Sequence, residues 1–210
     1  MYDWANEWKK YQVHDLPKGE SGNWRVEKFS VSDEEAKHAN AMSAFSFGSR
    51  AYYVAGEFTR LMRGQAVIMS DTRDEVRDHL SPIRAAKGQC LIGGLGIGVV
   101  TNGCLLKPEV EHVTVIELSE DVIKLVSDHY KKKFGDRLTI IHDNVMTWKP
   151  PRGMRYDMAW FDIWDNICTD NCKDMGTLNR RYARCTSWKG SWKEDDCKYW
   201  LRQEKRSSFL

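Results

Sequence analysis

Hydrophobic positions in the middle of the chain fall into short apolar runs separated by segments with helical spacing. The runs at 90–92, 113–116, 138–141 and 156–161 predict four buried strands. After each of the first two runs, apolar residues recur three or four positions apart, which predicts amphipathic helices, the second capped by Ser119. Strands and helices that alternate at these lengths predict an α/β fold with a mostly parallel sheet of order 3-2-1-4.

Smaller elements are predicted before this core. Residues 1–50 are polar apart from scattered aromatic side chains, and they contain one helical pattern at Ser32–Phe45. A β-hairpin is expected over 52–70, with its turn at 63–65. A single helix is expected from Arg73 onward, because its apolar positions fall three or four residues apart.

The pattern changes after residue 165, where no aliphatic or β-branched run of four residues occurs. The later strands of a larger sheet are therefore expected to be missing. Helices are predicted at Cys172–Arg184 and Asp195–Glu204, with a loop at 187–192 between them. The chain accordingly divides into an N-terminal helical segment with a hairpin (1–86), an α/β core (87–166) and a helical, aromatic-rich tail (167–210).

Composition places the 210-residue chain among ordinary soluble proteins, with 30% charged and 41% hydrophobic residues. A net charge of +2 gives no electrostatic footprint for nucleic acid, although the tail is locally basic. No apolar stretch is long enough to span a bilayer, and the N-terminus lacks the pattern of a signal peptide. We therefore predict a cytoplasmic protein whose six scattered cysteines are free thiols and which holds no metal.

The most informative motif is a glycine turn that directly follows the first apolar run. Gly94, Gly96 and Gly98 alternate with apolar residues and lead into a helical pattern, and the second apolar run ends in Glu117. Glycines allow a backbone to approach a ligand closely, and an acid at the second strand end binds the two hydroxyls of a ribose. This combination predicts a Rossmann-like nucleotide pocket.

Polar residues follow the other strands at equivalent points. Asp143-Asn144 follow the third run and Asp162 follows the fourth. Because the carboxyl ends of parallel strands meet at one edge of a sheet, these side chains are expected to converge there. Buried carboxylates need partners, and a ligand rich in hydroxyls and amines supplies them.

Residues 52–166 resemble class I S-adenosylmethionine-dependent methyltransferases and the related spermidine synthases. The resemblance implies that the glycine turn passes under the methionine part of the cofactor. It further implies that Glu117 holds the ribose, that Leu118 packs beside the adenine, and that Asp143 and Asn144 bind the adenine edge.

The spermidine synthase side of this resemblance is closer in detail. Asp74-Glu75-Val76-x-x-His79 is similar to an element of those enzymes before the glycine turn, and Asp162-Ile-Trp-Asp165 falls where they carry a D-x-x-D motif. This implies catalytic roles for Asp162 and Asp165, and substrate contacts for His79 and Trp164. Similar short phage and bacterial proteins share the run Met69-Ser-Asp-Thr72 and the D-I-W-D segment.

The chain also departs from spermidine synthases. The turn reads Gly93-Gly-Leu-Gly-Ile-Gly98, without the acid that would meet an aminopropyl ammonium, and Asp78 and Leu80 replace a Tyr and a Glu. We therefore expect methyl transfer from S-adenosylmethionine to a small nucleophile. The alternatives are aminopropyl transfer from decarboxylated S-adenosylmethionine, cleavage of the cofactor to methylthioadenosine, and a non-catalytic adenosyl-ligand binder. A small-molecule substrate is expected, without nucleic acid or membrane, and the exposed sheet edges predict a homo-oligomer.

Overall fold

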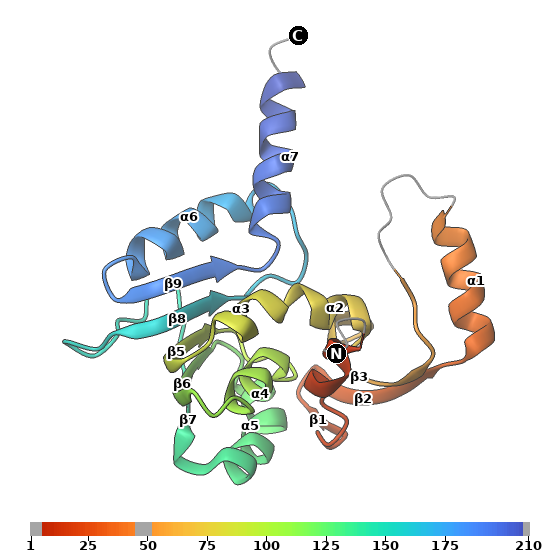
Figure 1. Cartoon of the computed structure of the whole chain (residues 1–210), viewed down its shortest axis with the longest axis horizontal. Coiled ribbons are helices and arrows are strands. Elements are labelled where there is room, and N and C mark those ends of the chain that lie inside the picture. Colours follow the sequence, from red (N-terminus) through yellow and green to blue (C-terminus); the bar gives the residue numbers. More distant parts are fainter. Residues whose placement is uncertain (1–5, 45–51, 208–210) are drawn as a thin grey trace.

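The computed structural model describes residues 6–44 and 52–207, which form two separate sheets (Figure 1). The larger sheet has five parallel strands in the order β7-β6-β5-β8-β9. Its strands are β5 (Gly88–Gly93), β6 (Val110–Glu117), β7 (Leu138–His142), β8 (Tyr156–Phe161) and β9 (Thr186–Ser191). The predicted α/β class and the 3-2-1-4 order of the first four strands are confirmed.

The fifth strand corrects the prediction for the tail. The segment expected to be a loop at 187–192 forms most of β9, which pairs in parallel with β8 from Tyr156 opposite Thr186 to Phe161 opposite Ser191. Trp188 of β9 stacks on Trp160 of β8, with ring centroids 6.3 Å apart. Backbone pairing and this stack therefore stabilise β9 without the run of aliphatic residues from which we predict a strand.

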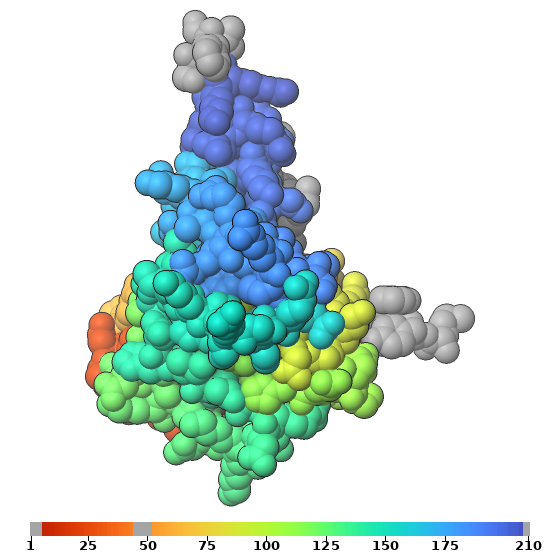
Figure 2. All heavy atoms as spheres, turned by 90° about the vertical axis from the view of Figure 1, so that its left-hand side faces the viewer, coloured from red at the N-terminus to blue at the C-terminus, as the bar shows by residue number. Residues whose placement is uncertain are grey.

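Helices cover both faces of the parallel sheet. One face packs against α3 (Leu80–Ala85), α4 (Val99–Leu105) and α5 (Glu120–Phe134), and the other packs against α6 (Asn171–Tyr182). The tail ends in α7 (Glu194–Ser207), which contacts α6 at its base and projects from the body of the molecule (Figure 2). No described helix combines the length and apolar character needed to cross a membrane.

The smaller sheet is antiparallel, in the order β1-β2-β3-β4. The predicted hairpin is present as β3 (Gly56–Arg63) and β4 (Ala66–Ser70), and the sequence did not predict β1 (Gly19–Ser21) or β2 (Trp24–Val31). The first helical pattern forms α1 (Asp33–Ala44), and the last predicted residue, Phe45, lies outside the described residues. Short 3-10 helices occupy Glu7–Tyr11 and Gly135–Arg137.

Two polar contacts tie this sheet to the rest of the chain. The buried carboxylate of Asp71 accepts hydrogen bonds from the backbone N–H of Val13 at 2.9 Å and of Thr59 at 2.6 Å. The Ser21 hydroxyl donates to Asp121 at the start of α5 at 2.7 Å. The Asp71 bonds hold the segment before β1 against β3, and the Ser21 bond links β1 to α5, which packs on the parallel sheet.

The helix predicted from Arg73 onward is divided in two. It consists of α2 (Arg73–Asp78) and α3, and His79 between them has φ −95° and ψ 0°, outside the helical region. Apolar spacing continues across the break, so the sequence pattern gave no sign of it. The break directs His79 toward the end of β8.

Candidate functional site

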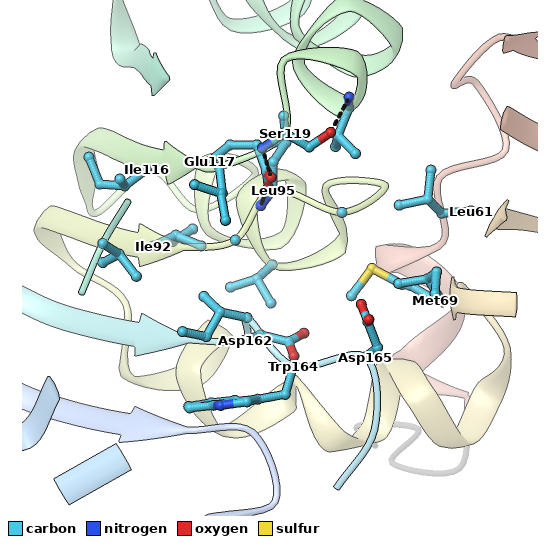
Figure 3. Close-up of a pocket in the computed structure, with 18 of the residues that line it drawn as sticks. Leu61, Met69, Ile92, Leu95, Ile116, Glu117, Ser119, Asp162, Trp164 and Asp165 are labelled. Atoms are coloured by element: carbon cyan, nitrogen blue, oxygen red, sulfur yellow. Dashed lines mark hydrogen bonds between the residues drawn. The ribbon is translucent and has the colours of Figure 1, made fainter. Parts of the chain in front are cut away.

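A cavity of about 460 Å³ lies at the carboxyl ends of β5, β6, β7 and β8 (Figure 3). Its sheet side is formed by residues that follow these strands, and its other side by the antiparallel sheet. The predicted site residues that line it are Gly94, Gly96, Glu117, Leu118, Asp143, Asn144, Asp162, Trp164 and Asp165. Gly98 and His79 do not line it.

Glu117 is held by backbone donors at the end of β6. The N–H of Leu95 donates to one carboxylate oxygen and the N–H of Ser119 to the other, both at 2.7 Å. Each oxygen keeps a second lone pair, because an ionised carboxylate accepts about four hydrogen bonds. The next residue, Leu118, has 66% of its surface exposed. The pair presents an oriented carboxylate beside an apolar side chain.

The glycine turn is shaped by contacts within the protein. Gly94 has φ +93°, and a Cβ there would lie 2.0 Å from the carbonyl oxygen of Asp162. Gly98 precedes α4 with φ +81°, and a Cβ there would lie 2.2 Å from the Tyr130 ring. Gly94 therefore allows β5 and β8 to end side by side at the cavity, whereas Gly98 serves the packing of α4 against α5.

Asp143 and Asn144 turn the chain after β7. One carboxylate oxygen of Asp143 accepts from the N–H of Asn144 at 2.6 Å, and the Asn144 side-chain oxygen accepts from the N–H of Met146 at 2.9 Å. These bonds fix both side chains at the cavity wall. Asn144 lines the same cavity as Glu117, and its side-chain amide nitrogen is a hydrogen-bond donor.

Asp162 is the acid with the most perturbed environment at the site. Burial, and then the charges of Glu75, Asp78 and Glu117, raise its pKa to about 7. Its side chain is 14% exposed, and one carboxylate oxygen lies 3.5 Å from Nε2 of His79. Asp162 therefore changes its charge near neutral pH while it lines the cavity.

His79 lies behind Asp162 and is buried. Burial, and then the charge of Lys193, lower its pKa to about 4, so the imidazole is neutral at neutral pH. Lys193 in turn pairs with Asp78 at 2.9 Å. His79 is placed to orient Asp162 from outside the cavity.

Asp165 forms an ion pair with Arg63 of β3, a residue for which the sequence gave no signal. Arg63 also lies over the ring of Trp24, with its guanidinium carbon 5.3 Å from the ring centroid. Both partners of the ion pair are 43% exposed. The pair links the antiparallel sheet to the segment after β8 and neutralises the second acid of the D-x-x-D segment.

Metal-binding geometry is not found in the described part of the chain, where no three His, Cys, Asp or Glu residues are grouped to hold an ion.

No protein-family model and no curated protein sequence matches the chain. Among solved structures, it is similar to the CcbJ methyltransferase from Streptomyces caelestis, with 17% identity, 52% of this chain and 44% of that chain covered, and a TM-score of 0.43. It is also similar to the Pyrococcus horikoshii protein PH1948, with 11% identity, 54% of this chain and 58% of that chain covered, and a TM-score of 0.42. The N-terminal domain of EvdMO1, with SAH bound, is 16% identical, with 54% of this chain and 45% of that chain covered and a TM-score of 0.40. The matched part thus spans about half the length of these proteins, and likeness at this level assigns no activity to the chain.

Proposed function

We propose that this chain binds S-adenosylmethionine and transfers its methyl group to a small nucleophile. One observation carries the proposal: a single cavity is lined by the glycine turn, Glu117, Asp143-Asn144 and Asp162, each at the end of a different parallel strand. The cavity volume of about 460 Å³ falls within the range of about 300–1,000 Å³ typical of small-molecule and cofactor sites.

The residues present fit the parts of this cofactor. The lone pairs that remain on Glu117 suit two ribose hydroxyls, and the exposed Leu118 offers an apolar surface to the adenine. The Asn144 amide and the Asp143 carboxylate offer a donor and an acceptor for the adenine edge. The carboxylates that face the cavity also favour a cation over a neutral ligand.

The cofactor supplies an activated methyl group on its sulfonium. Asp162 accepts the proton of an acceptor O–H or N–H, because a pKa of about 7 keeps much of it ionised at neutral pH while leaving it basic enough to bind a proton. Neutral His79 holds the orientation of this carboxylate. Apolar walls that include Leu61, Met69 and Trp164 exclude water from the acceptor.

Methyl transfer is favoured over aminopropyl transfer by the state of Asp165. A polyamine acceptor carries several ammonium groups and needs several carboxylates to bind them. Asp165 is already paired with Arg63, whereas the neighbour of Asp162 is the neutral His79, so Asp162 is the one acid of the D-x-x-D segment that remains for an ammonium group. Cleavage of the cofactor and binding without turnover are outcomes that the experiment below separates.

Calorimetry with S-adenosylmethionine and S-adenosylhomocysteine tests the binding step. We expect Glu117→Ala to weaken binding by about 1–3 kcal/mol, the scale of a lost charge-assisted hydrogen bond. Glu120→Ala is the matched control, because its side chain is 63% exposed at the start of α5 and lies outside the cavity. Equal affinities of the two variants would refute the ribose contact.

Mass spectrometry of the reaction products tests the transfer step. The wild-type protein is incubated with S-adenosylmethionine, alone and with cell-extract small molecules. Formation of S-adenosylhomocysteine only with extract supports methyl transfer. Methylthioadenosine without extract indicates cleavage, and no product in either mixture indicates a binder.

A further inference from the structure

Three cysteines gather at a point outside the cavity, where the segment after β8 meets α6 and α7. Cys168 precedes α6, Cys172 lies in the first turn of α6, and Cys197 lies in the first turn of α7. The Cys197 thiol donates to the backbone carbonyl of Cys168, with Sγ 3.0 Å from the oxygen. Cys172 lines a surface hollow together with Leu201, which lies one turn after Cys197 on α7, and the neighbouring Cys172 thiol helps to raise the pKa of Cys197. The packing of α6 on α7 thus brings together two thiols that are 25 positions apart in sequence.

We propose that Cys172 and Cys197 form a reversible disulfide, which makes this pair a modification site that joins α6 to α7. The third thiol is directed elsewhere, because Cys168 donates to the side-chain oxygen of Asn171 at 3.3 Å. These thiols are not arranged as a metal site within the described residues.

Exposure decides which thiol reacts first. Cys172 is partly exposed and lines a surface hollow together with Thr169, Lys173 and Leu201. Cys197 is fully buried, and burial raises its pKa to about 11, so it rests as a protonated thiol. A peroxide therefore reaches Cys172 and not Cys197.

The two steps balance with hydrogen peroxide as the oxidant. In the first, the Cys172 sulfur attacks the peroxide, becomes a sulfenic acid and releases one water. In the second, the Cys197 sulfur attacks the sulfenic sulfur, and the sulfenic hydroxyl leaves with the Cys197 proton as a second water. A small thiol reverses the reaction by disulfide exchange and is itself oxidised.

The link would strengthen an attachment that is now sparse. The described contacts of α7 with the body include hydrogen bonds from Thr169 to Glu204 at 3.2 Å and from Asn179 to Glu194 at 2.9 Å. The disulfide would close a ring that contains α6 and the edge strand β9. Oxidation should therefore raise the midpoint of thermal unfolding, because the ring restricts the unfolded chain.

Peptide mapping of the intact protein tests the proposal. Fully reduced protein is treated with hydrogen peroxide, remaining thiols are alkylated, and digested peptides are identified by mass spectrometry with and without reduction. We expect one thiol-reversible cross-linked peptide that contains Cys172 and Cys197. Cys172→Ser and Cys197→Ser should each abolish it, and Cys185→Ser, which changes a partly exposed thiol at another place, should leave it unchanged.

Other outcomes of the same mapping would overturn the proposal. They are a disulfide that includes Cys168, or conversion of Cys172 to sulfinic acid while Cys197 is recovered alkylated. The mapping of the wild-type protein is decisive by itself, so the result stands even where a serine variant fails to fold. Because the readout is a peptide mass, it is independent of the proposed methyl transfer.

Discussion

Replacement of Asp162 by Asn tests the unusual environment of this acid through its effect on stability. Burial and neighbouring carboxylates raise its pKa from the usual 3.8 to about 7. Over that interval the shift corresponds to about 4 kcal/mol, at about 1.4 kcal/mol per pKa unit. Its side chain is 14% exposed, so solvent screens little of this effect.

The direction in which stability changes with pH follows from which state, folded or unfolded, holds the proton of Asp162. Between the two pKa values the folded state holds a proton on Asp162 that the unfolded state has released, so the contribution of Asp162 to stability falls as the pH rises through this range. The destabilisation that ionised Asp162 causes is absent below the pKa of the unfolded state and complete above about pH 7. Asn has the same shape and carries no charge, so its variant avoids this cost.

Urea unfolding of wild type and Asp162→Asn at several pH values measures the effect. We expect the stability of the variant relative to wild type to grow by about 3 kcal/mol between about pH 5 and about pH 8. Asp143→Asn, which changes an exposed carboxylate, should change stability by less than about 0.5 kcal/mol at every pH. A difference for Asp162→Asn that does not vary with pH would refute the reasoning.

Three further predictions concern backbone geometry, catalysis and assembly. Gly94→Ala should cost at least about 2 kcal/mol in thermal or urea unfolding, because its Cβ would collide with the Asp162 carbonyl. Gly153→Ala is the control, because Gly153 has a similar φ and a Cβ there would have nothing within 4 Å; it should lower stability by about 1 kcal/mol. Equal losses of stability in the two variants would contradict the collision with the Asp162 carbonyl. Methyl transfer should fall as the pH drops below about 7, with protonation of Asp162, and a rate that stays flat to pH 5 would remove its role as base. Sedimentation velocity should detect a homo-oligomer, because β7 and β9 form the outer edges of the parallel sheet, and a monomer at micromolar concentration would contradict this.

The core of the fold was predictable because its strands are buried on both faces and read as apolar runs. β5 and β6 are of this kind, with Leu91, Ile92 and Val115 fully or almost fully buried. The sequence missed β2 and β9 for the opposite reason. β2 buries only Val26 among eight residues, and β9 is a polar edge strand held by backbone pairing and a tryptophan stack.

The candidate site was likewise predictable from the sequence only in part. Acids that follow parallel strands share one edge by topology, so the meeting of Glu117 and Asp162 at one cavity followed from the predicted sheet. The pairing of Arg63 with Asp165 joins residues 102 positions apart on two different sheets. Such a contact depends on how the sheets pack against each other, and no local pattern encodes that.

The most direct test of the account is a crystal structure of the protein with S-adenosylhomocysteine. We predict that the two ribose hydroxyls lie within hydrogen-bond distance of the Glu117 carboxylate and that the sulfur is turned toward Asp162. A nucleoside bound elsewhere on the protein, or with its ribose away from Glu117, would contradict it.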